Sequence, residues 1–100
     1  MILEKRWSRT NGYPSWKQPE YALSDGSVLK EWWLLYSPTA GRFWGTRRDC
    51  QPLSMARRWA CGRDAASMAA EENHRVAKSL ERGHPLEGHF GDWMQIRVVE

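Results

Sequence analysis

A β-hairpin is predicted by residues 20–36, EYALSDGSVLKEWWLLY. At its centre, Asp25-Gly26 supplies the residue types that a two-residue type I′ turn requires, because both central positions of that turn take a positive φ. The first strand is expected over residues 20–24. The turn then places Leu23 opposite Val28.

The second strand of this hairpin, expected over residues 27–36, is apolar on both faces. Five consecutive apolar residues run from Trp32 to Tyr36, and successive side chains of a strand point to opposite faces. Trp33 and Leu35 therefore share one face, and the other three share the opposite face. Two apolar faces are typical of a strand in the middle of a sheet, so we expect this strand to be central.

Alternating patterns predict three further strands, at residues 2–9, 42–48 and 92–100. The first is an edge strand, the second continues the meander, and the third closes the sheet. In the second, alternation places Trp44 on the same face as Arg42, Thr46 and Arg48. Because those neighbours are polar, Trp44 is expected to point outward.

A loop is expected over residues 11–19, because two prolines there oppose regular strand pairing. Its Tyr13 and Trp16 are expected to fold back onto the sheet, since aromatic side chains bury a large apolar area. This loop competes with a binding partner for the sheet face that a single helix leaves open.

One long helix is predicted over Ala65–Arg82. Asp64 is a suitable N-cap, and Gly83 suits the C′ position. Asn73 is expected to be a hydrogen-bonded core amide, because buried polar groups usually find partners. At 100° per residue the apolar side chains form a wide stripe that we expect to pack on the sheet. The stripe consists of Ala65, Ala66, Ala69, Ala70, Val76, Ala77 and Leu80.

Together these elements predict one α+β domain over residues 1–100. It has an antiparallel meander sheet of four to five strands, one long amphipathic helix on one face, and a C-terminal closing strand. A short helix over Leu53–Ala60, with Pro52 in its first turn, is expected before the long one. The 100 residues are 41% hydrophobic, which favours one packed domain over a disordered chain.

Composition also bears on location. The longest uninterrupted apolar run has five residues, far fewer than the roughly 18 that span a bilayer. The first residues reach charge at Glu4, so the apolar core of a signal peptide, roughly 7–15 residues, is missing. We therefore expect a cytoplasmic protein, in which Cys50 and Cys61 remain reduced thiols.

The sequence contains no motif that defines a reaction. The two cysteines and three histidines match no standard zinc spacing, and the glycines of residues 83–91 lack the lysine and hydroxyl residue that end a phosphate-binding loop. Glu71, Glu72 and Glu81 are expected on a solvated helix face. We expect no enzyme activity, no metal and no cofactor.

Binding remains as the expected function. Trp, Tyr and Arg dominate many protein interfaces, and arginines gather between residues 42 and 63, where Asp49 is the single acid. The candidate partner-binding residues are Arg42, Trp44, Arg47, Arg48, Arg57, Arg58 and Trp59. The expected partner is a protein or a second copy of the chain, as for a small accessory or inhibitory protein of a mobile element. The alternative is a nucleic-acid-binding module in which Arg42–Arg63 meets phosphates and the interleaved aromatics stack on bases.

Overall fold

Six strands, one α-helix and a short 3-10 turn follow one another in the computed structural model, which describes residues 2–9 and 17–100. The elements are β1 (Ile2–Arg9), β2 (Lys17–Leu23), β3 (Val28–Ser37), β4 (Arg42–Trp44), β5 (Cys50–Gln51), η1 (Leu53–Met55), α1 (Gly62–Glu81) and β6 (Met94–Val99). The predicted α+β class is confirmed. The sheet has one strand more than expected, because the two-residue β5 extends the meander.

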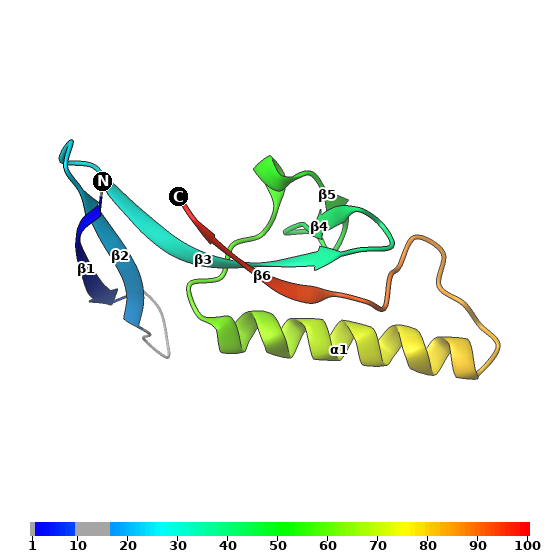
Figure 1. Ribbon diagram of the computed structural model, residues 1–100. Coiled ribbons are helices and arrows are strands. Elements are labelled where there is room, and N and C mark those ends of the chain that lie inside the picture. Colours follow the sequence, from blue (N-terminus) through cyan, green and yellow to red (C-terminus); the bar gives the residue numbers. More distant parts are fainter. Residues whose placement is uncertain (1, 10–16) are drawn as a thin grey trace.

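Strand β3 organises the sheet. The meander follows the order β1-β2-β3-β4-β5, and β6 pairs with β3 outside that path. In Figure 1 the β1–β2 hairpin lies at one end of the long β3, and α1 runs along one side of β3 and β6. In this view η1 and the β4–β5 hairpin are drawn across β3 from α1, and β4 continues the sheet at the edge of β3. The molecule is consequently elongated, with principal extents of 55 × 27 × 17 Å.

The β2–β3 turn differs from the predicted type I′ turn. Gly26 has a φ of +87°, whereas Asp25 lacks the positive φ that type I′ requires. The amide of Leu23 donates to the carbonyl of Ser27 at 2.9 Å, which leaves a three-residue connection. Val28 therefore lies opposite Ala22 and not Leu23, so the predicted register was wrong by one residue.

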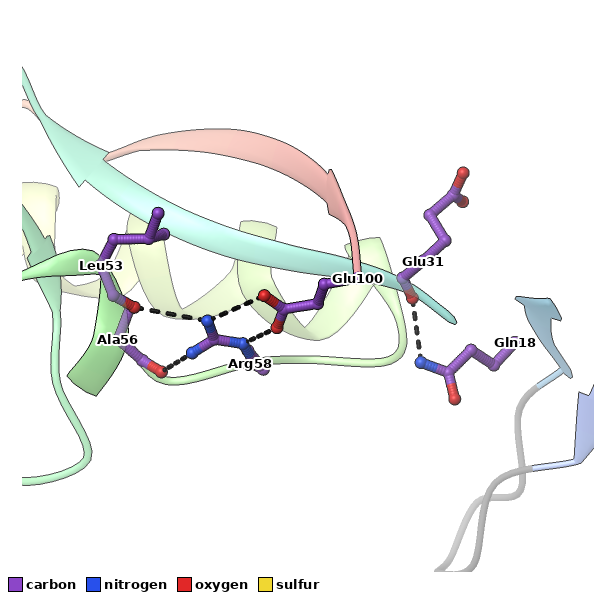
Figure 2. Close-up of polar contacts among 6 residues, drawn as sticks. All are labelled: Gln18, Glu31, Leu53, Ala56, Arg58 and Glu100. Atoms are coloured by element: carbon purple, nitrogen blue, oxygen red, sulfur yellow. Dashed lines mark hydrogen bonds and ion pairs between the residues drawn. The ribbon is translucent and has the colours of Figure 1, made fainter. Parts of the chain in front are cut away.

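Strand β2 separates from β3 after Lys30. The backbone of Lys30 bonds to Glu100 beyond β6, so Glu31 and Trp33 direct their backbone groups to the opposite edge. There the Gln18 side chain donates to the Glu31 carbonyl at 2.9 Å (Figure 2). Trp59 then exchanges two backbone hydrogen bonds with Trp33.

The predicted loop over 11–19 is partly wrong, because residues 17–19 belong to β2. Its other residues, with Tyr13 and Trp16, lie outside the described residues.

Helix α1 packs on the sheet with a narrower face than predicted. Its buried residues are Ala65, Ala69 and Glu72, and the first two join the tryptophan-rich core. The expected stripe extended too far around the helix, because four of its members are exposed. They are Ala66, Ala70, Ala77 and Leu80.

The ends of α1 follow from two glycines. The helix begins at Gly62, with Cys61 and not Asp64 as N-cap. A Cβ at Gly62 would lie 3.0 Å from the Trp33 ring, so a glycine permits this close contact. At the other end Gly83 takes a φ of +74°, and His84 donates to the carbonyl of Ser79 at 2.9 Å. This is the expected glycine-terminated end.

Two other predicted elements are shorter in the structure. The strand expected over 42–48 ends at Trp44, because Gly45 donates to the carbonyl of Asp49 at 2.8 Å and the chain reverses. The helix expected over 53–60 is limited to η1. Beyond η1 the chain is extended, with isolated bridges from Ala56 to Gly45 and from Trp59 to Trp33.

Candidate binding surface

The predicted binding residues come from two segments, residues 42–48 and residues 57–59, and the structure brings these segments together. Arg57 donates its backbone N–H to the carbonyl of Trp44 at 2.8 Å, and Gly45 bridges to Ala56. The arginine-rich segment after η1 therefore lies against β4. The sequence indicated only that arginines are concentrated between residues 42 and 63. Their individual side chains lie in different environments.

The prediction that Trp44 points outward is wrong. Trp44 is 2% exposed and Trp59 is 7% exposed, and both belong to the core. The Trp44 ring meets the Trp93 ring edge to face, with centroids 5.0 Å apart. Because β4 ends at Trp44, Thr46 and Arg48 do not continue its face as the predicted alternation required. Neither tryptophan is available to a partner.

Arg58 is held by the protein itself. Figure 2 shows its guanidinium between the Glu100 carboxylate and two backbone carbonyls. Arg58 donates to the carbonyl of Ala56 at 2.8 Å and to that of Leu53 at 3.3 Å, and its Nε pairs with Glu100. The Glu100 hydrogen bond also raises the pKa of Arg58. Arg58 thus links the segment after η1 to Glu100.

Arg57 stacks its guanidinium on the Trp59 ring, 4.7 Å from the centroid. Such a cation–π contact covers an aromatic face that would otherwise meet water. Arg57 is half-buried in this arrangement. Arg57 therefore shields the Trp59 ring, at the edge of the core, from water.

Three of the predicted residues are exposed cations: Arg42, Arg47 and Arg48. Within residues 2–9 and 17–100 none of the three forms an ion pair. A hollow of about 300 Å³ lies beside Arg47. Its lining consists of Thr46, Arg47, Asp49, Gln51 and Met55. These cations are free to meet an anionic group.

Strands β3 and β6 carry an apolar face that the predicted site did not include. Residues opposite each other in a sheet share a face, and Leu34 is opposite Ile96. We call this the outer face, because it is opposite the side that packs on α1. Its residues are Trp32, Leu34, Tyr36, Met94, Ile96 and Val98. Leu34 is fully buried, whereas Met94 is 49% exposed and the other four are half-buried. The alternation within residues 92–100 contained this signal.

The backbone of β6 has one open edge. Glu100 directs both backbone groups toward Lys30, and successive residues of a strand direct theirs to opposite edges. Gln95, Arg97 and Val99 therefore direct theirs away from β3, and in the part of the chain that the structure describes no strand pairs with that side.

One side chain closes the end of this edge. Asn73 Nδ2 donates to the Trp93 carbonyl at 3.1 Å, and the Trp93 N–H donates to Asn73 Oδ1 at 2.9 Å. The hydrogen bonds predicted for Asn73 are confirmed, but the side chain is half-buried and not part of the core. The open edge thus begins after Trp93.

A buried ion pair lies between α1 and the loop that follows it. Glu72 was expected on a solvated face, but it is buried and accepts two hydrogen bonds from Arg75. Arg75 also reaches Nδ1 of His89 at 2.9 Å. Burial opposes ionisation of Glu72, yet Arg75 and His89 hold the pKa of its carboxyl below the ordinary value. This carboxylate keeps its charge at neutral pH and ties the loop to the helix.

Other chemistry finds little support in the described residues. Cys50 and Cys61 are free, and burial raises the pKa of the Cys50 thiol. Among residues 2–9 and 17–100, no group of three His, Cys, Asp or Glu side chains could hold a metal ion. No described helix has the length and apolar character to cross a membrane. Comparison of the chain with protein-family models, curated proteins and solved structures finds no match.

Proposed function

We propose that the protein is a small non-catalytic binding protein that engages a protein partner through β6. The carrying observation is the open edge at Gln95, Arg97 and Val99 beside the apolar outer face. An exposed edge offers unpaired N–H and C=O groups, and an added strand satisfies them. Side chains of the outer face would supply the apolar contact that backbone pairing alone lacks.

The composition of β6 supports this proposal. Natural sheets often protect an edge with proline, a bulge or inward-pointing charge. Strand β6 contains no proline and pairs with β3 over six consecutive residues without a bulge. Its one charged residue, Arg97, lies 3.5 Å from the carboxylate of Glu31 in the same chain. The edge therefore has few of the features that prevent pairing.

Two substitutions of matched exposure test this proposal. Met94 is 49% exposed on the outer face, and Leu53 is 48% exposed in η1. We expect Met94→Asp to abolish both self-association and capture of other proteins from nuclease-treated lysate, with Leu53→Asp leaving them intact. The proposal is wrong if Met94→Asp associates like the wild type or if the wild type engages no protein, its own copy included.

The exposed arginines favour a second candidate, nucleic-acid binding. Arg42, Arg47 and Arg48 have no carboxylate partner among the described residues, so they could contact phosphates. Trp44 and Trp59 are buried and offer no stacking surface. We expect weak, strongly salt-dependent binding at most. A mobility-shift titration of wild type and of Arg47→Glu/Arg48→Glu at low salt tests this candidate, which fails if the wild type shifts no DNA or RNA.

A further inference from the structure

We propose that the partner is a second copy of this chain, joined to the first by antiparallel pairing of two β6 strands about a two-fold axis at Ile96. This inference rests on the proposed function. It adds the identity of the partner and the register of the contact.

The backbone allows only some registers. Hydrogen-bonded pairs need outward-directed groups on both strands, so odd-numbered residues of one copy must meet odd-numbered residues of the other. With the axis at Ile96, Gln95 meets the partner's Arg97 and Arg97 meets the partner's Gln95. Each pair exchanges two hydrogen bonds, which gives four across the axis. Asn73 occupies the backbone of Trp93, so the pairing ends there.

Side chains select this register over the neighbouring one. On the outer face Ile96 meets the partner's Ile96, and Met94 meets the partner's Val98. On the face toward α1, the Arg97 guanidinium meets the side-chain oxygen of the partner's Gln95, because Nε2 of Gln95 already donates to the carbonyl of Gly62 in its own chain at 2.6 Å. An axis at Arg97 would instead oppose two arginines and place Met94 against the partner's Glu100, and like charges directly opposite each other are destabilising.

The arrangement also fixes where the two copies of α1 lie. A two-fold axis between antiparallel edges is perpendicular to the sheet, so both copies of α1 lie on the same side. The two outer faces then form one continuous apolar row across the axis. In this register β6 is complementary to a second β6: apolar residues meet apolar residues, and a cation meets an amide. This self-complementarity favours a second copy over an unrelated strand.

Disulfide cross-linking of single-cysteine variants tests the register of the β6–β6 contact directly. A disulfide needs Cα atoms about 4.4–6.8 Å apart, a range that residues directly opposite each other fulfil. In a background of Cys50→Ala and Cys61→Ala, we expect Ile96→Cys to form covalent dimers under mild oxidation. Gln95→Cys or Arg97→Cys alone should not cross-link, whereas an equimolar mixture of the two should.

A second pair protects the test against a folding defect at residue 96. We expect a mixture of Met94→Cys and Val98→Cys to cross-link, with neither doing so alone. Light scattering should show a dimer for the wild type and a dissociation constant at least about tenfold higher for Met94→Asp than for Leu53→Asp.

Each failure has a distinct meaning. Cross-linking of Arg97→Cys alone, without Ile96→Cys, overturns the register. A wild type that remains monomeric up to about 0.5 mM overturns the second copy as partner. If Met94→Asp still loses capture of another protein in that case, the proposed function stands without this inference. If no partner of any kind depends on Met94, both are overturned.

Discussion

The side chain of Asn73 pairs with the backbone of Trp93 as a neighbouring strand would. Its amide donates to the Trp93 carbonyl at 3.1 Å and accepts from the Trp93 N–H at 2.9 Å. Helix α1 thereby ends the open edge of β6 at a defined residue. The same contact joins the helix to the sheet.

Loss of the Asn73 amide should destabilise the fold. Asn73→Ala leaves both backbone groups of Trp93 without a partner, and an unsatisfied buried group costs about 1–3 kcal/mol. We expect the free energy of unfolding to fall by about 2 kcal/mol in urea denaturation. His74→Ala, at an exposed neighbouring position, is the control. Equal stability of the two variants would contradict the role of Asn73.

A lysine scan along α1 tests which face packs on the sheet. Ala69 is buried and belongs to the core, whereas Ala70 is exposed. Ala69→Lys introduces a charge and excess volume into the core, so we expect a loss of at least about 3 kcal/mol. Ala70→Lys should change stability by less than about 0.5 kcal/mol. Thermal melts that rank the variants in the opposite order would show that the helix packs with another face.

Trp44 should be essential for folding and not for binding alone. Because its ring is buried against Trp93, Trp44→Ser leaves a large cavity and should cost about 3–5 kcal/mol. Urea denaturation measures this loss, and Trp44→Phe should recover part of it. A Trp44→Ser variant that melts like the wild type but fails to associate would instead place Trp44 on the binding surface.

Acid should weaken the protein through Glu72 and Asp92. Asp92 accepts hydrogen bonds from Ser37 and Thr39, which hold its pKa below the ordinary 3.8 although burial opposes this. The pKa of Glu72 likewise lies below 4.5.

The sign of the pH dependence follows from these lowered values. Since the unfolded chain binds these protons more tightly, the stabilisation is complete above the ordinary values and is lost as pH falls through the folded ones. We expect the free energy of unfolding to fall steeply below about pH 4. Asp92→Asn should flatten this slope in urea denaturation at several pH values, and an unchanged slope would contradict the contribution of Asp92.

The sequence predicted elements better than it predicted their faces. The hairpin, the central β3 and the glycine-terminated helix end depend on local residue types, and all three are confirmed. The turn register depended on the backbone angle of Asp25, which residue type alone leaves open. Alanines on several sides of α1 made the buried face ambiguous, and the sheet selected the side with Ala65 and Ala69.

The candidate site was harder to predict because it depends on long-range pairing. The prediction that Trp44 points outward required β4 to continue to Arg48. The strand instead ends at Trp44, because the chain reverses at Gly45. Pairing of β6 with β3 places residue 31 opposite residue 99, a contact that no local pattern encodes. The open edge of β6 became visible only with that pairing.

Hydrogen exchange of single backbone amides tests the open edge of β6 most directly. In dilute protein, the amides of Met94, Ile96 and Val98 should be protected by β3, while those of Gln95 and Arg97 exchange rapidly. At concentrations where the protein associates, Gln95 and Arg97 should gain protection. Slow exchange of both in the monomer, or rapid exchange of both in the associated protein, would contradict binding through this edge.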